Sequence, residues 1–205
     1  DKVLYYLGSL FLQTEDLEVA ISYFNKIESE SALFHDSHIQ MAQILSAMAL
    51  ERDEDFGRFE KFVTTKSKQH EELAVELKVL LASFHEEKKD FAKAIELVNE
   101  VRENKAYTEN HDYYLASLYE KVRKFEESRI VIEQLLAKNP ENAHALNFLG
   151  YSLLEQNTEL DKAFAYIKKA VDLKPEDGFI RDSLGWYYYK TGNLEMALVE
   201  IKKAW

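Results

Sequence analysis

The sequence predicts an all-α protein, a right-handed α-solenoid of about six helix-turn-helix repeats and about twelve helices. The first indication is composition: 46% of the residues are hydrophobic and 31% are charged, with only six glycines and two prolines. Such a chain is too apolar for disorder and too poor in turn residues for an all-β fold. The second indication is a set of small residues that recur at steps of 34, 40, 34, 34 and 35, namely Gly8, Ala42, Ala82, Ala116, Gly150 and Gly185. A fixed period near 34 is typical of stacked helical repeats.

The two C-terminal copies carry the repeat pattern most clearly. Gly150 and Gly185 each follow a leucine and lie 35 residues apart, while Ala163 and Ala197 lie 34 apart. A small residue at the eighth place of one helix and at the twentieth place, on the next helix, lets the two backbones approach closely. Large apolar residues around these places then fill the seam. Each copy is therefore predicted to be a pair of packed helices.

The segment SLGWYYYKTGNLEMALVEIKKAW, which begins at Ser183, resembles the tetratricopeptide repeat (TPR) family. It supplies Leu184, Gly185, Tyr188 and Ala197 at the spacing of the family pattern. The repeat that contains this segment departs from the family pattern at Arg181, where the family commonly has tryptophan.

Laid along the chain, the TPR template covers essentially all 205 residues with varying quality. The second copy is degenerate, because its turn is longer than in the others. The last copy is shorter than a full repeat. The resemblance implies six repeats, at residues 1–34, 35–74 (degenerate), 75–108, 109–142, 143–177 and 178–205 (truncated).

In TPR proteins the first helix of each repeat lines a concave groove that binds a protein or peptide. The places of the template that face this groove are rich in aromatic residues here, and rings of this kind form binding hot spots. The alternative role for the same rings is packing between helices. Among the groove positions, Asn147 is placed to hydrogen-bond a peptide backbone. The candidate groove residues are Tyr5, Tyr6, Tyr113, Tyr114, Asn147, Phe148, Tyr151, Trp186 and Tyr189.

One TPR subtype grips the terminal carboxylate of a chaperone with lysine, arginine and asparagine. Only Asn147 fits that pattern, and Asp182 and Trp186 hold the places of the basic residues. An anionic ligand would find no cation there. The net charge of −11 and the pI near 5.1 likewise disfavour nucleic acid as a partner.

The sequence carries no Gly-rich phosphate loop, zinc-binding HExxH helix or GxSxG elbow. His35 and His38, near Asp36, could bring two imidazoles to one helical face, but no third metal ligand is evident. The carboxylate pairs Glu86–Glu87 and Glu126–Glu127 are interpreted as solvated helix surface. We therefore expect a non-enzyme with no cofactor, no metal and no small-molecule substrate.

The predicted function is a non-catalytic scaffold or adaptor that binds a protein or peptide segment. The C-terminal double motif is also similar to bacterial TPR proteins, including outer-membrane lipoproteins that act as adaptors for periplasmic processing proteases. This favours the periplasm or the outer membrane over the cytoplasm. Two alternatives stay open: the substrate-selecting or regulatory arm of a larger enzyme such as a glycosyltransferase, and a cytoplasmic adaptor for a small GTPase polarity system.

The ends of the chain suggest two further expectations. The chain begins at Asp1 and stops at Trp205 within a repeat, which predicts a fragment of a longer protein. The apolar residues of its last helix predict self-association through the terminal repeat.

Overall fold

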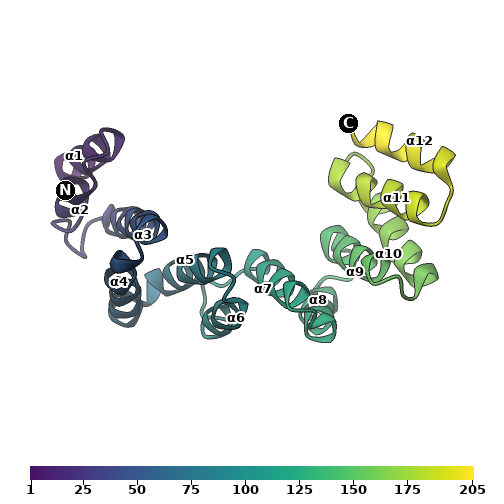
Figure 1. Cartoon of the computed structure of the whole chain (residues 1–205), viewed down its shortest axis with the longest axis horizontal. Coiled ribbons are helices and arrows are strands. Elements are labelled where there is room, and N and C mark those ends of the chain that lie inside the picture. Colours follow the sequence, from purple (N-terminus) through teal and green to yellow (C-terminus); the bar gives the residue numbers. More distant parts are fainter. The chain divides into compact units, whose positions relative to one another are not determined.

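The computed structural model describes all residues from Asp1 to Trp205 and contains twelve α-helices, two short 3-10 helices and no strand (Figure 1). The predicted all-α class is confirmed. The helices are α1 (Lys2–Gln13), α2 (Leu17–Phe24), α3 (Phe34–Glu51), η1 (Asp53–Asp55), α4 (Phe56–Gln69), η2 (Glu71–Leu73), α5 (Ala74–Glu87), α6 (Phe91–Asn99), α7 (Glu109–Lys121), α8 (Phe125–Lys138), α9 (Ala143–Glu155), α10 (Leu160–Leu173), α11 (Gly178–Lys190) and α12 (Leu194–Ala204).

The chain forms two compact units, residues 1–111 and 112–205. The first holds α1 to α6, and the second holds α8 to α12 together with all but the first turn of α7. Within the first unit, α1 packs on α2, α3 on α4 and α5 on α6; within the second, α9 packs on α10 and α11 on α12. None of the twelve helices has both the length and the apolar character that crossing a membrane would require.

The turns inside the helix pairs recur with the sequence period. Lys89, Arg123, Asn157 and Gly192 adopt a left-handed backbone, with φ between 54° and 85°, at steps of 34, 34 and 35 residues. Each is followed by a residue whose N–H donates to the carbonyl five residues earlier, as in Asn193 to Tyr188 (2.8 Å). This arrangement is a standard way to end a helix. The repeat is therefore visible in backbone geometry as well as in side chains.

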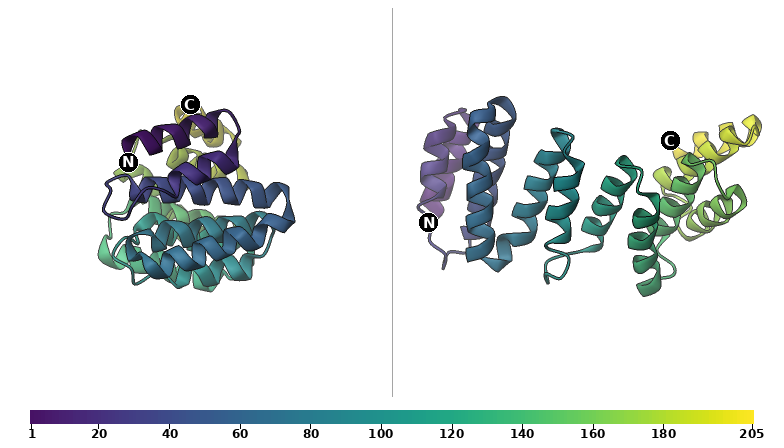
Figure 2. Two further views of the ribbon diagram at one scale, coloured as in Figure 1. Left: turned by 90° about the vertical axis from the view of Figure 1, so that its left-hand side faces the viewer. Right: turned by 60° about the horizontal axis from the view of Figure 1, so that its bottom comes forward.

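The pair α3 and α4 is joined differently. Here α3 continues to Glu51 and a 3-10 turn, η1, leads into α4, without a left-handed residue. Figure 2 shows α3 and α4 side by side. Their core includes Leu45 and Phe59, whose exposed fractions are 2% and 0%. The longer connection lies where the sequence pattern is degenerate.

The recurring small residues lie where two helices of a pair nearly touch. A Cβ atom added at Gly150 would lie 2.6 Å from Ile167 Cγ1, and one added at Gly185 would lie 2.7 Å from Ile201 Cγ1. At Gly8 the added atom would meet the ring of Phe24 at 2.6 Å. Glycine is favoured at these places because an added methyl group would have to displace its neighbours.

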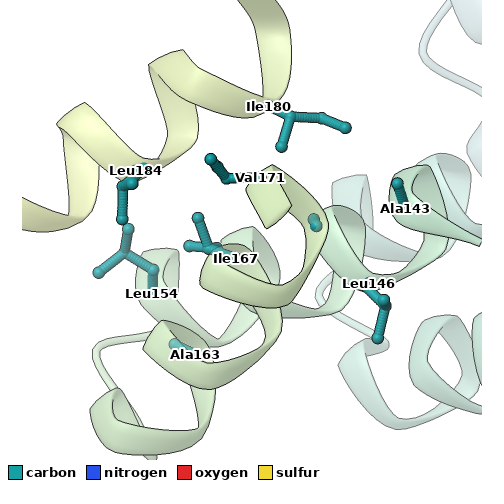
Figure 3. Close-up of a cluster of buried hydrophobic side chains, with 9 residues drawn as sticks. Ala143, Leu146, Leu154, Ala163, Ile167, Val171, Ile180 and Leu184 are labelled. Carbon is teal, nitrogen blue, oxygen red and sulfur yellow. The ribbon is translucent and has the colours of Figure 1, made fainter. Parts of the chain in front are cut away.

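The core of the second unit connects α9, α10 and α11. Figure 3 shows Leu154, Ile167 and Leu184 close together at one side of this cluster, which also includes Val171 and Ile180. Three helices of this unit, α9, α11 and α12, start at side-chain caps: Asn142 Oδ1 accepts from the N–H of Ala145 (3.1 Å), and Asp177 and Asn193 cap α11 and α12 in the same way. This packed block fixes the first helices α9 and α11, which carry the candidate site.

Candidate functional site

Four side chains of α9 and α11 form the centre of the candidate site, which we call the α9–α11 box: Tyr151, Glu155, Asp182 and Trp186. Residues four apart lie on the same face of a helix, so Tyr151 and Glu155 share one face of α9, and Asp182 and Trp186 share one face of α11. The two helices contact each other. The indole Nε1–H of Trp186 donates to Glu155 Oε1 at 2.7 Å, which joins the two faces.

The aromatic rings of this surface are accessible. Tyr151 is 43% exposed and Tyr189 is 54% exposed. The rings of Trp186 and Tyr189 stack, with centroids 5.2 Å apart and planes 16° apart. A stacked pair with exposed edges presents a flat, rigid apolar platform beside the carboxylates.

The charges of the box are only partly compensated. Lys190 donates from Nζ to the carbonyl of Leu154 (2.9 Å) and lies 3.4 Å from Glu155 Oε1, so Glu155 has both a cation and the indole as partners. Asp182 is exposed and has no ion-pair partner. Its neighbour Arg181 is directed to α12 instead, where it pairs with Glu200. One carboxylate of the box is therefore free.

The charges of both carboxylates, Glu155 and Asp182, act on the hydroxyl group of Tyr151. Partial burial raises the pKa of its hydroxyl above the ordinary value, and the negative charges of Glu155 and Asp182 raise that pKa further. A phenolate beside two carboxylates would be repelled by them, so the neutral hydroxyl is favoured. Tyr151 thus presents a neutral ring and a hydrogen-bonding hydroxyl at physiological pH.

The predicted residues of α7 and the first half of α9 are more enclosed. The rings of Tyr113 and Phe148 lie 6.4 Å apart, and the hydroxyl of Tyr113 donates to Asn142 Oδ1 at 3.0 Å. Tyr114 is half-buried. The Oδ1 atom of Asn147 is covered and has no hydrogen-bond partner. These four residues serve helix packing at least in part, which is the alternative role considered from the sequence.

Tyr5 and Tyr6 lie in the other compact unit. The ring of Tyr5 packs against Phe24 of α2, with centroids 5.5 Å apart, whereas Tyr6 is 70% exposed. Of the nine predicted residues, the structure therefore brings Tyr151, Trp186 and Tyr189 together on one accessible surface of the second unit. Asn147 and Phe148 lie about one turn earlier on α9, and Tyr113 and Tyr114 lie on α7.

The histidines considered for a metal have separate environments. His35 lies 3.3 Å from Glu76 and 3.4 Å from Asp36, at the surface. His38 is 1% exposed, and its Nδ1 lies 3.0 Å from the carbonyl of Phe34. Burial lowers the pKa of His38 to about 4, with a further contribution from the charge of Lys66. The imidazole of His38 is part of the hydrophobic core.

Three hollows lie away from the aromatic surface. One of about 220 Å³ is lined by α8, α9 and α10 around Arg129, whose guanidinium is paired with Glu126 and Glu133. Two of about 440 and 500 Å³ lie in the first unit, the former around Lys78 and the latter around Ile21. Their lining residues include none of the nine candidates.

Sequence reasoning left Glu155 out of the candidate set. Its position four residues after Tyr151, on the same helical face, was the signal that could have included it. The role of Arg181 was also missed: its guanidinium Nη1 lies 2.7 Å from Glu200 Oε2 across the α11–α12 seam, and both side chains are largely buried. The residue that departs from the family pattern thus joins two helices.

Comparison with known proteins supports the resemblance to tetratricopeptide repeats. Residues 113–178 match the family model described as tetratricopeptide repeat. Over 70 residues the chain is 41% identical to a TPR repeat-containing protein of Pseudomonas aeruginosa; this stretch is 34% of the chain and 12% of that relative. The matched segment, residues 113–178, is therefore assigned to the tetratricopeptide repeat family. The chain spans only a small part of the curated relative it matches.

Solved structures share the fold of this chain. A tetratricopeptide repeat protein from Parabacteroides merdae superposes with a TM-score of 0.68 at 16% identity, covering 98% of this chain and 77% of the other. MamA from Desulfovibrio magneticus gives 0.57 at 19% identity, covering 82% and 93%. YrrB, described as a TPR protein with an unusual peptide-binding site, gives 0.56 at 17% identity, covering 88% and 90%. At these identities the similarity concerns the fold.

Proposed function

We propose that this chain is a non-catalytic interaction scaffold that binds a segment of a partner protein on the inner helices of its repeats. The observation that carries the proposal is the accessible stack of Trp186 and Tyr189 beside the exposed ring of Tyr151. Rigid aromatic side chains bury a large area at a small cost in conformational entropy, and for that reason they dominate binding hot spots. The peptide-binding site described for YrrB supports the same use of this fold.

The surface suits an extended segment better than a small molecule. Small-molecule sites are concave and enclose most of the ligand. The three hollows described above have linings without the candidate aromatic residues, and the rings of the second unit follow successive first helices instead. A partner chain lying across α7, α9 and α11 would contact them in turn.

As the finer function we propose an adaptor in the bacterial envelope that presents a partner to a processing protease. The matching relative from Pseudomonas aeruginosa supports a bacterial setting. The alternatives are a substrate-selecting arm of a larger enzyme and a cytoplasmic adaptor of a small GTPase system. The sequence that adjoins this stretch in the gene distinguishes them, since a catalytic domain supports the enzyme arm and a lipid-bearing leader supports the envelope.

Self-association through the last repeat is a separate proposal. Leu194, Leu198 and Trp205 on or after α12 are 62%, 56% and 102% exposed. Apolar side chains gathered on one helix favour contact with another surface. Light scattering over a range of concentrations tests it, and a mass that stays monomeric at the highest concentration contradicts it.

The experiment for the scaffold function is affinity capture followed by quantification of each bound protein. Tyr151→Ala and Trp186→Ala remove rings of the aromatic surface, while Tyr166→Ala removes a ring from the second helix α10 as a matched control. We expect the first two variants to lose specific partners at least tenfold and the control to keep them. Equal capture by all of the variants, with unchanged helical content, would overturn the proposal.

A further inference from the structure

We propose that the α9–α11 box receives a basic side chain, preferably arginine, of the partner segment. This inference rests on the proposed scaffold function and narrows it to partners that present a cation to this surface. The box is Tyr151, Glu155, Asp182 and Trp186, as defined above.

The carboxylate of Asp182 provides the charge for this contact. It is exposed on α11 and has no ion-pair partner, because Arg181 is engaged with Glu200 on the other side of the helix. Lys190, the cation near the box, is held at the C-terminal end of α9 by the carbonyl of Leu154 and by Glu155. An incoming guanidinium therefore meets an uncompensated negative charge.

The rings supply the second part of the recognition. Cations are attracted to the faces of tryptophan and tyrosine, and the planar guanidinium also stacks on them. Trp186 is held in place from two sides, by its hydrogen bond to Glu155 and by its stack on Tyr189. A ring that is already fixed loses little conformational entropy when a ligand binds.

Arginine fits this arrangement better than lysine for a geometric reason. A guanidinium donates two parallel hydrogen bonds to one carboxylate, whereas an ammonium acts as a point charge.

The chain offers an internal probe, because it contains only two tryptophans. Trp205 is fully exposed at the end of the chain, and Trp186 lies in the box. In a ¹⁵N-labelled protein each indole N–H gives its own NMR signal, and the Trp205→Phe variant assigns them. The probes are a nona-arginine peptide and a nona-citrulline peptide, which replaces each guanidinium by an uncharged group of similar shape.

We expect nona-arginine to shift the Trp186 indole signal with saturation at physiological salt, and nona-citrulline to leave it in place. Asp182→Asn should raise the Kd for nona-arginine at least fivefold. Glu127→Gln removes one exposed negative charge from α8 and is the matched control, with an expected change of less than twofold. Thermal unfolding of both variants checks that the fold is retained.

Two results would overturn the inference. One is an unmoved Trp186 signal at saturating nona-arginine. The other is an equal loss of affinity in Asp182→Asn and Glu127→Gln, which would mean general attraction to an acidic protein. If, in either case, the Tyr151→Ala variant still loses its partners in the affinity-capture experiment, the scaffold function stands and only the proposal of a basic ligand is wrong. If capture is also unaffected, both proposals fail.

Discussion

The close approach of α9 and α10 can be tested by adding one methyl group, in Gly150→Ala. The added Cβ would lie 2.6 Å from Ile167 Cγ1 and 2.9 Å from the backbone oxygen of Ala163. Ordinary van der Waals contact begins near ~3.4 Å, so these atoms must separate by roughly 0.8 and 0.5 Å. Ile167 is fully buried and β-branched, and it has few alternative rotamers to move into.

The magnitude follows from two opposing terms. Overpacking a well-filled core costs about 1–3 kcal/mol, and replacing glycine by alanine inside a helix gains about 1 kcal/mol. Because one clashing atom belongs to the backbone, we place the packing cost in the upper half of its range. Gly150→Ala should therefore lower the free energy of unfolding of the second unit by about 1–2 kcal/mol.

The measurement is urea unfolding followed by tryptophan fluorescence in the Trp205→Phe background, where Trp186 reports on the second unit. The control is Gly57→Ala on α4, where an added Cβ has no neighbour within 4 Å and should stabilise the first unit by roughly 0.5–1 kcal/mol. Far-UV circular dichroism follows that control.

The double variant Gly150→Ala/Ile167→Ala tests whether the contact with Ile167 causes the loss of stability. Ile167→Ala removes the atom that clashes, so in its background Gly150→Ala should become neutral or stabilising. The explanation is refuted if Gly150→Ala stabilises the protein in the wild-type background as Gly57→Ala does. It is also refuted if the cost is unchanged after Ile167 is truncated.

Three further outcomes follow. Gly192→Ala should cost about 1 kcal/mol, since its φ of 85° is unfavourable for alanine although the space is open; a neutral result in urea unfolding contradicts this. Burial keeps the pKa of His38 at about 4 in the folded protein, against 6.5 in the unfolded chain. The unfolded chain therefore binds the proton more readily, and the free energy of unfolding should fall by roughly 2–3 kcal/mol as the pH is lowered from 6.5 to 4. His38→Gln should remove that part of the pH dependence, and parallel curves for the two proteins would disprove it. Burial tends to raise the pKa of Glu200, but the interactions with Lys203 and Arg181 outweigh burial and the pKa is lowered. Glu200→Gln should therefore lower the free energy of unfolding by about 2 kcal/mol at neutral pH. This difference should shrink in acid, where Glu200 becomes protonated. Unfolding at pH 7 and below pH 4 checks it, and a cost independent of pH would argue against the pairing.

The repeat architecture was readable in the sequence because it depends on local and periodic features. Gly150 and Gly185 mark the close approach of two helices, and Gly192 marks the left-handed turn between them. Each of these requirements involves neighbours within one repeat, and the repetition of the pattern multiplies the signal. The same regularity predicted which helices would carry the aromatic residues.

The candidate site was predicted only as a set of helix faces, and tertiary packing decided the role of each ring. Tyr113 and Tyr151 occupy comparable first helices, yet Tyr113 is bonded to Asn142 in the seam while Tyr151 remains accessible. Exposure depends on the size and the tilt of the neighbouring helix, which a one-dimensional pattern does not contain.

The sequence by itself determined the all-α class, the period, the resemblance to tetratricopeptide repeats and the small residues at the helix seams, since these follow from local backbone requirements repeated along the chain. Only the tertiary structure decided the pairing of Arg181 with Glu200, the burial of His38 and the uncompensated charge of Asp182. The physical reason is that ion pairing, burial and exposure arise between helices. They depend on which side chains of the adjoining helix lie within a few ångströms.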